Sequence, residues 1–137
     1  MSYRDIAKVQ LKVDEGTKFK PYRDTAGKLT IGTGRNLDDK GLSPQEVDFL
    51  LENDLNDAEY DARELFPTFD QLSDARKAVL INMAFNLGRE RLRLFRKLRK
   101  AVDALDFESA YVEMVSSTWA DQTGPRATRL AKQMKDG

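Results

Sequence analysis

Residues 14–34 read DEGTKFKPYRDTAGKLTIGTG, and this stretch decides the fold because it joins the end of a helix to a hairpin. A helical pattern of apolar residues runs into Glu15 and stops at Gly16. The members of that pattern are Ile6, Val9 and Val13. An extended segment, 19–22, then enters a glycine-containing turn, and a second strand follows through Thr30. The stretch therefore predicts a helix followed by a small antiparallel hairpin.

Two carboxyl groups and a hydroxyl fall within this stretch, those of Glu15, Asp24 and Thr30. A helix C-terminus disfavours negative charge, so Glu15 is expected to favour its protonated form. Asp24 enters a polar turn, where a carboxylate stays ionised. Two carboxyl groups in such different environments indicate an acid and a base. Taken singly, each residue also has an ordinary explanation, as a surface glutamate, a turn-forming aspartate or a strand threonine.

The rest of the chain is predicted to be mostly helical. Residues 43–46 form a strong helix start, and this helix should run until Pro67 and bridge a small lobe and a helical lobe. The next helix, capped by Ser73 and ended by Gly88, is apolar on nearly every side, which is typical of a buried central helix. Three more helices are predicted: one through Leu92, Phe95, Leu98 and Val102, one through Phe107, Ala110, Tyr111 and Met114, and one opened by Pro125. The predicted fold class is α+β, predominantly helical, with one short antiparallel sheet in the N-terminal lobe.

Composition narrows the possible chemistry. The 137 residues include 23 basic and 23 acidic side chains, so bulk charge indicates no nucleic-acid partner. Cysteine and histidine are both absent, which excludes thiol catalysis and Ser-His-Asp catalysis and argues against a zinc site. No apolar run approaches the roughly 20 residues that span a bilayer, and the N-terminus lacks a signal-peptide pattern. We therefore expect the chain in the cytoplasm of the cell that makes it.

Three separated motifs occur in one order along nearly the whole chain. The first comprises Glu15-Gly16, Pro21-Tyr22, Asp24, Gly27, Thr30-Ile31-Gly32 and Gly34. The second is the run AVLINMAFNLG at 78–88, and the third comprises Trp119, Gln122, Thr123 and Arg126. Together the motifs resemble those of the phage-type lysozymes, the muramidase endolysins. The resemblance implies a single lysozyme-like catalytic domain, 1–137, with one lobe of about 14–60 and another of 1–13 plus 61–137.

The resemblance also implies roles for individual residues. Glu15 would protonate the leaving oxygen, and Asp24, assisted by the Thr30 hydroxyl, would act on the attacking water with inversion. Four residues are expected to bind substrate or support the site: Phe85, Gln122, Thr123 and Arg126. Arg126 has an alternative role in an ion pair with Glu15. Trp119 is expected to be structural.

The function implied by the resemblance is that of an endolysin. Such an enzyme hydrolyses the β-1,4 bond between N-acetylmuramic acid and N-acetylglucosamine in bacterial peptidoglycan and thereby lyses the host cell. It would act as a monomer without metal or cofactor, and it would depend on a holin to pass from the host cytoplasm to the wall in the periplasm. Three alternatives stay open: a lytic transglycosylase, a non-catalytic wall-binding module, and a helical protein that acts on membranes.

Two features depart from the family's pattern. Arg35 stands where relatives commonly have histidine, and Asp54 is its expected acidic partner, so that Asp54→Asn should lower stability more than activity. Arg96 follows Phe95 where relatives often have serine. The same region carries a basic run, whose members are Arg89, Arg91, Arg93, Arg96, Lys97, Arg99 and Lys100. The simplest interpretation is one amphipathic helix with a solvated basic face; the alternative is a face that binds anionic wall polymer or the bacterial outer membrane.

Overall fold

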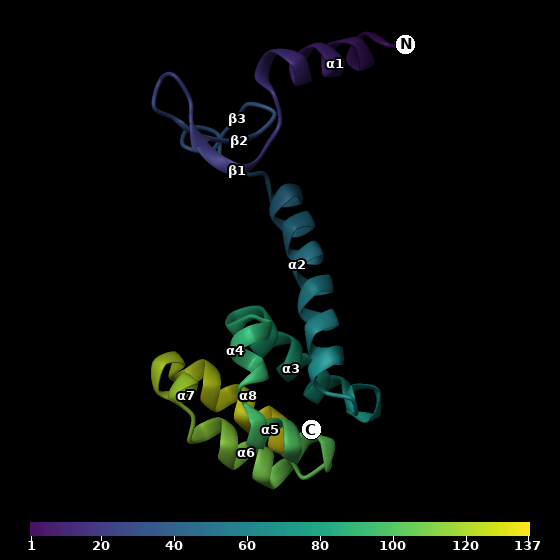
Figure 1. Ribbon diagram of the computed structural model, residues 1–137, viewed down its shortest axis with the longest axis vertical. Coiled ribbons are helices and arrows are strands. Elements are labelled where there is room, and N and C mark those ends of the chain that lie inside the picture. The colour runs from purple at the N-terminus through teal and green to yellow at the C-terminus, as the bar shows by residue number, and fades with distance from the viewer. The chain divides into compact units, whose positions relative to one another are not determined.

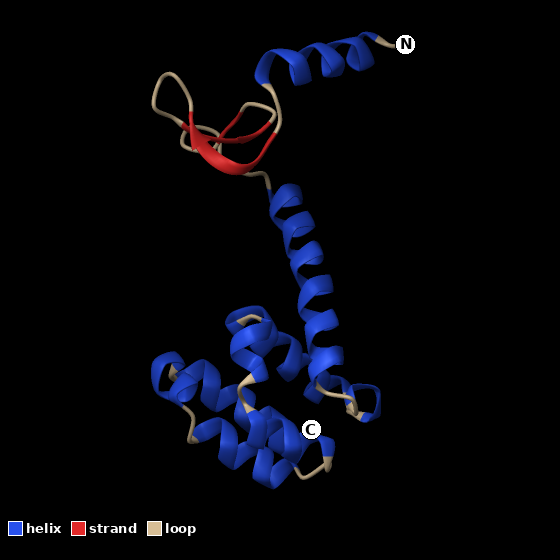
Figure 2. Cartoon of the chain, in the orientation of Figure 1, coloured by secondary structure: helices blue, strands red, loops and turns tan.

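The computed structural model describes residues 1–137 and divides into two compact units, Met1–Phe49 and Leu50–Gly137 (Figure 1). The elements in chain order are α1 (Tyr3–Glu15), β1 (Lys18–Arg23), β2 (Leu29–Gly32), β3 (Arg35–Asn36), α2 (Pro44–Leu65), a 3-10 turn (Phe69–Gln71), α3 (Asp74–Leu87), α4 (Arg89–Arg93), α5 (Arg96–Asp103), α6 (Phe107–Val115), α7 (Thr118–Thr123) and α8 (Pro125–Asp136). All three strands belong to the first unit, and the second is helical (Figure 2). The predicted α+β, predominantly helical fold class is confirmed. The grouping of 1–13 with 61–137 in one lobe stays a prediction.

Helix α1 has well-defined ends. At its start, the Ser2 hydroxyl accepts the Asp5 N–H while the Asp5 carboxylate accepts the Ser2 N–H, which satisfies two backbone donors that the helix leaves free. At its other end, Gly16 has φ 73°, a conformation that glycine adopts without strain, and its N–H bonds to the Lys12 carbonyl. The helix therefore ends at Glu15, as the sequence predicts.

The sheet is antiparallel, in the order β1-β2-β3. Tyr22 pairs with Thr30, and Thr30 in turn pairs with Asn36, so the predicted strand threonine lies on the central strand. The register shifts between Lys18 and Tyr22. Pro21 lies in this shifted segment, where its lack of an N–H costs no regular ladder bond because β1 is an edge strand.

Helix α2 confirms the predicted helix from Ser43 toward Pro67. The Ser43 N–H donates to Glu46 Oε1 at 2.8 Å, and the Glu46 N–H donates to Ser43 Oγ at 3.2 Å, which forms a reciprocal capping box. The helix ends at Leu65, two residues before the proline that cannot continue it. The boundary between the two compact units falls within this helix.

In the second unit α8 packs against α3, α6 and α7, while α6 also packs against α5 and α3 also packs against α4. Ser73 caps α3 by accepting the Arg76 N–H, and Gly88 ends the helix with φ 80°. The largest fully buried side chains are Phe66, Leu80, Met83, Leu92, Leu98, Met114, Met134, Val79 and Val102. Each fully buried Leu or Met contributes roughly 1.5–3 kcal/mol of apolar transfer free energy. Helix α3 supplies Val79, Leu80, Met83, Ala84 and Leu87 to the core, but Phe85 is 45% exposed, so the helix is buried on one side and not all round as predicted.

The expected single helix through Leu92 and Val102 is wrong. It is two helices, α4 and α5, because Phe95 leaves the helical conformation with ψ 62°. Leu92 and Leu98 are both fully buried, yet residues six apart point to different faces of one straight helix. The break lets both leucines enter the same core. Helix α7 was not expected either, whereas the predicted helices α6 and α8 are confirmed. No helix combines the length and apolarity that crossing a bilayer requires.

Candidate active site

Glu15 ends α1 with its carboxyl group against Gly34. A Cβ atom added at Gly34 would lie 3.0 Å from Glu15 Oε2 and 3.1 Å from its Cδ. Close by, the hydroxyls of Thr17 and Thr33 are 3.3 Å apart. The absence of a side chain at residue 34 therefore makes room for the carboxyl group of the candidate acid.

Asp24 follows β1 and organises the turn that leads to β2. Its Oδ1 atom accepts the N–H of Ala26 at 2.9 Å and that of Lys28 at 2.8 Å, so the turn-forming explanation of this residue is confirmed. The Oδ2 atom accepts no hydrogen bond from the protein. One oxygen thus fixes the orientation of the carboxylate, and the other is left for water or a ligand.

Thr30 is the buried polar residue of the sheet, with 4% of its surface exposed. Its hydroxyl donates to the Lys28 carbonyl at 2.9 Å, so the oxygen keeps its lone pairs as acceptors. The carbonyl that Thr30 binds belongs to the residue whose N–H binds Asp24 Oδ1. The hydroxyl and the carboxylate are therefore held through one shared residue, Lys28.

A cavity of about 610 Å³ lies in the first unit, and its lining residues do not include Glu15, Asp24 or Thr30. Its lining includes Gly34, and therefore reaches the residue that contacts the Glu15 carboxyl group. Arg35 and Glu46 also line it, and Arg35 Nη1 lies 2.6 Å from Glu46 Oε2. The guanidinium, followed by the Ser43 N–H, lowers the pKa of Glu46 to about 2, and Glu46 raises the pKa of Arg35.

This ion pair gives Arg35 a partner that the sequence did not predict. The carboxylate that it binds belongs to Glu46, on the first turn of α2. The expected pair of Arg35 with Asp54 stays a prediction. Sequence reasoning assigned Glu46 to the helix cap alone, although its carboxylate serves both purposes. Oε1 accepts from the Ser43 N–H and from Arg35 Nη1, and Oε2 lies 2.6 Å from the same Nη1. The stability effect expected of Asp54→Asn stays a prediction, and loss of the Glu46 carboxylate is expected to lower stability as well.

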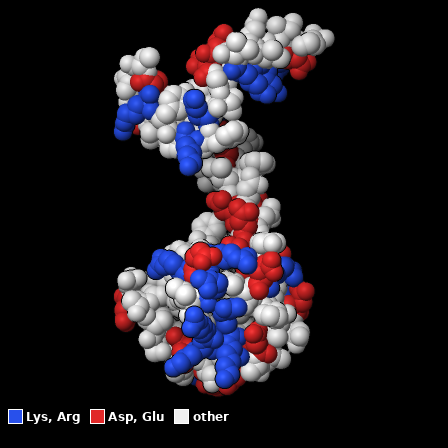
Figure 3. Space-filling model, in the orientation of Figure 1, with Lys and Arg blue, Asp and Glu red and all other residues white.

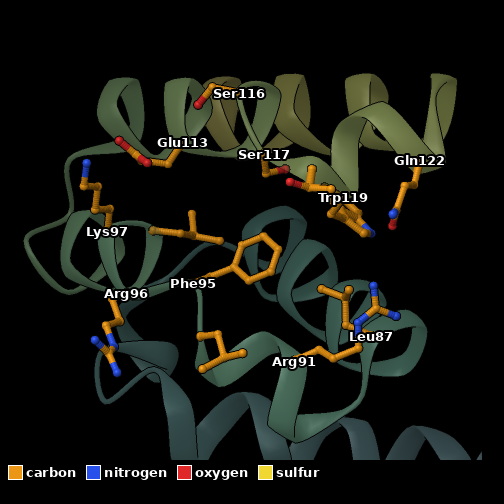
Figure 4. Close-up of a pocket in the computed structure, with 13 residues that line it drawn as sticks. Leu87, Arg91, Phe95, Arg96, Lys97, Glu113, Ser116, Ser117, Trp119 and Gln122 are labelled. Atoms are coloured by element: carbon orange, nitrogen blue, oxygen red, sulfur yellow. The ribbon is translucent and has the colours of Figure 1, made fainter.

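Four candidate substrate-binding residues lie in the second unit. Phe85, on α3, is 45% exposed and lines a cavity of about 230 Å³ together with Asp54, Asp57 and Asp61. Gln122, on α7, lines a separate cavity of about 580 Å³ with Trp119 and Phe95 (Figure 4). Thr123 ends α7 and is partly exposed. These exposures leave Phe85, Gln122 and Thr123 free to contact a ligand.

Arg126, on α8, donates twice to one amide oxygen. Its Nε and Nη2 lie 3.0 and 2.6 Å from Asn82 Oδ1 on α3. The alternative ion pair of Arg126 with Glu15 stays a prediction. Trp119 is 3% exposed, and its indole N–H donates to Asn86 Oδ1 at 2.8 Å, so its structural role is confirmed.

Sequence reasoning missed the two asparagines, and a signal for them existed. Asn82 and Asn86 are the two amide side chains in the otherwise apolar run 78–88. Because they are four residues apart, they lie on one face of α3. Polar residues in that arrangement on a buried helix indicate specific partners on neighbouring helices.

Comparisons with known proteins identify the family of the chain. Residues 12–135 match the family described as phage lysozyme. In an alignment of 160 positions the chain is 29% identical to the probable T4-type lysozyme 2 of Dictyostelium discoideum. In an alignment of 159 positions it is 30% identical to the probable T4-type lysozyme 1 of the same organism. Each match covers 95% of this chain and 94% of the relative. The pre-baseplate central spike protein Gp5 of Enterobacteria phage T4 is 31% identical over 148 residues, which cover 88% of this chain and 26% of that protein.

The chain belongs to the phage lysozyme family. It is a glycoside hydrolase of the muramidase class.

Proposed function

We propose that this enzyme hydrolyses the β-1,4 bond between N-acetylmuramic acid and N-acetylglucosamine in bacterial peptidoglycan. Membership of the phage lysozyme family supports a wall glycan as substrate. The absence of histidine and cysteine supports a mechanism that uses only carboxyl and hydroxyl groups. In this mechanism Glu15 and Asp24 divide the work of acid and base.

In the proposed reaction Glu15 donates one proton and Asp24 accepts another. Glu15 donates its proton to the glycosidic oxygen as the bond from the anomeric carbon to that oxygen breaks. A water molecule attacks the anomeric carbon from the opposite side and gives a proton to Asp24, so the product has an inverted configuration. Thr30, whose hydroxyl oxygen can still accept a hydrogen bond, assists in orienting that water.

The observation that carries the proposal is that the two oxygens of the Asp24 carboxylate differ in their hydrogen bonds. Two backbone N–H groups hold Oδ1, which fixes the direction of Oδ2, and Oδ2 accepts no hydrogen bond from the protein. A base held this way loses little freedom when it binds the attacking water, and such preorganisation lowers the barrier. The contact of Glu15 with Gly34 restrains the acid similarly.

The residues of the second unit serve substrate binding in this proposal. The exposed ring of Phe85 offers an apolar face to a sugar, and Gln122 and Thr123 offer hydrogen-bonding groups. Arg126 positions α8 against α3 through Asn82 and so supports the site indirectly.

In its biological setting we propose an endolysin that lyses the host cell. The enzyme would accumulate in the host cytoplasm, reach the wall in the periplasm after a holin permeabilises the membrane, and act there as a monomer. Measurement of host lysis by induced expression with and without a co-expressed holin tests this setting.

The decisive experiment compares the parent with Glu15→Gln on purified Gram-negative peptidoglycan. Soluble muropeptides are collected, and their ends are identified by mass spectrometry. We expect reducing muramic ends from the parent and none from a folded Glu15→Gln protein. Anhydro-muramic ends would instead identify a lytic transglycosylase, and equal release by both proteins would exclude Glu15 as the acid.

A further inference from the structure

In the basic run at 89–100, some side chains form ion pairs or hydrogen bonds with the protein and others do not. Arg89 bonds Asp61, Arg93 bonds Glu90, and Arg99 donates to the carbonyls of Leu65 and Arg93. The other four cations are exposed and form no ion pair: Arg91, Arg96, Lys97 and Lys100. We call these four the basic face. Lys and Arg gather in a band over the part of the second unit that carries α4 and α5 (Figure 3).

The basic face surrounds apolar surface. Leu94, in the break between α4 and α5, is 59% exposed. It lines the cavity of about 580 Å³ together with Arg91, Arg96 and Lys97, and Leu87, Leu98 and Trp119 are among the cavity's other lining residues. The Phe95 ring stands in the middle of this lining (Figure 4). Lys100 lies one turn of α5 beyond Arg96 and therefore on the same side of that helix.

Local charge, and not the charge of the whole molecule, distinguishes this surface. The chain as a whole has a formal net charge of zero. Glu113 is the single carboxylate that lines the cavity, against three cations. A partner attracted here must therefore recognise this face specifically, because long-range attraction to the entire protein is weak.

We propose that the basic face docks on the surface of an anionic phospholipid bilayer, with its four cations toward the headgroup phosphates and Leu94 in the interfacial layer. A soluble polyanion would use the cations alone. An anionic bilayer uses both features, because its phosphates attract the cations and its acyl boundary accepts an exposed apolar side chain. The proposal does not depend on the reaction at Glu15; Gln122, proposed above to bind sugar, lines the same cavity but does not belong to the basic face.

The test measures the partitioning of the full chain onto vesicles in the absence of peptidoglycan. One set of vesicles contains equal parts of phosphatidylglycerol and phosphatidylcholine, and the other contains phosphatidylcholine alone. The variant Arg96→Gln/Lys97→Gln removes two charges of the basic face. Arg129→Gln/Lys132→Gln removes the same two types of charge from exposed, unpaired positions on α8 and serves as the matched control. Leu94→Ser tests the apolar contribution, and thermal melting verifies that each variant is folded.

We expect the parent to bind the anionic vesicles selectively and to dissociate at high salt. Arg96→Gln/Lys97→Gln should lower the partition coefficient roughly 30-fold, and the α8 control should change it less than about threefold. Leu94→Ser should lower it roughly fivefold. Equal binding to both vesicle types, or equal losses in the two double variants, would overturn the proposal. The proposal would also be overturned if Leu94→Ser bound the anionic vesicles as tightly as the parent does and bound inorganic polyphosphate equally well. The partner would then be a polyanion.

Discussion

Gly34 lies against the carboxyl group of Glu15, with so little space that a Cβ atom added at residue 34 would be 3.0 Å from Glu15 Oε2. Its φ of 71° also belongs to the left-handed region that favours glycine. Residue 34 is thus constrained both by its own backbone and by the side chain that we propose as the acid.

Gly34→Ala should therefore impair the reaction as well as the fold. The left-handed backbone costs an alanine about 1–2 kcal/mol in the free energy of unfolding, and the added methyl group must displace the Glu15 carboxyl. We expect the rate of muropeptide release per folded molecule to fall roughly 10- to 100-fold. Gly88→Ala is the matched control, because Gly88 has φ 80° and nothing within 4 Å of an added Cβ. If both variants release muropeptides at the same rate per folded molecule, the contact with Glu15 is irrelevant to catalysis.

The Arg35–Glu46 pair predicts a specific pH dependence of stability. The pKa of Glu46 is lowered from 4.5 to about 2, so the folded state binds its proton less readily than the unfolded state does. The stabilisation is complete above about pH 4.5 and is lost as the pH falls toward 2. Glu46→Gln keeps a side chain that can cap α2 but removes the charge. Its deficit in the free energy of unfolding should therefore be largest near neutral pH and shrink in this acid window.

Urea denaturation at several pH values checks this prediction. Glu52→Gln is a suitable control, because Glu52 is an exposed residue of the same helix and forms no ion pair. Its effect on stability should be small at every pH. A deficit of Glu46→Gln that stays constant from pH 7 to about pH 2 would contradict the assignment of the stabilisation to the ion pair.

The Trp119–Asn86 hydrogen bond predicts a coupled effect on stability. Asn86→Ala leaves the buried indole N–H without its 2.8 Å acceptor, which should cost about 1–3 kcal/mol. Trp119→Phe removes the donor, so Asn86→Ala should cost less in that background. A double-mutant cycle on the free energy of unfolding measures the difference. Additive effects would show that the hydrogen bond contributes nothing to stability.

Arg76 predicts how the end of α8 is held. Its Nε and Nη2 donate to the carbonyls of Met134 and Lys135 at 2.7 and 2.8 Å, and its guanidinium lies 3.5 Å from the centre of the Phe107 ring. These carbonyls belong to the last helical turn, which has no partners of its own. Arg76→Ala should lower stability by roughly 2 kcal/mol and speed hydrogen exchange in residues 133–137. Unchanged exchange there would show that α8 ends stably without Arg76.

Local signals predicted most of the elements correctly, and packing decided the exceptions. Helix ends at Gly16, Ser43 and Gly88 were predictable because a cap depends on a few consecutive residues. The break at Phe95 was not, because apolar residues from 92 to 102 are compatible with a helix until the positions of Leu92 and Leu98 in one core are known.

For the candidate site, the sequence by itself determined which chemical groups are present: two carboxyl groups and a hydroxyl within residues 15–30, in a chain without histidine or cysteine. Their catalytic roles stay proposals. Only the tertiary structure decided the partners, with Glu46 at Arg35, Gly34 at the Glu15 carboxyl, and Asn82 at Arg126. The physical reason is that helix and turn signals depend on residues within about one helical turn along the chain. The partner of a side chain instead depends on which groups the fold brings within hydrogen-bonding distance.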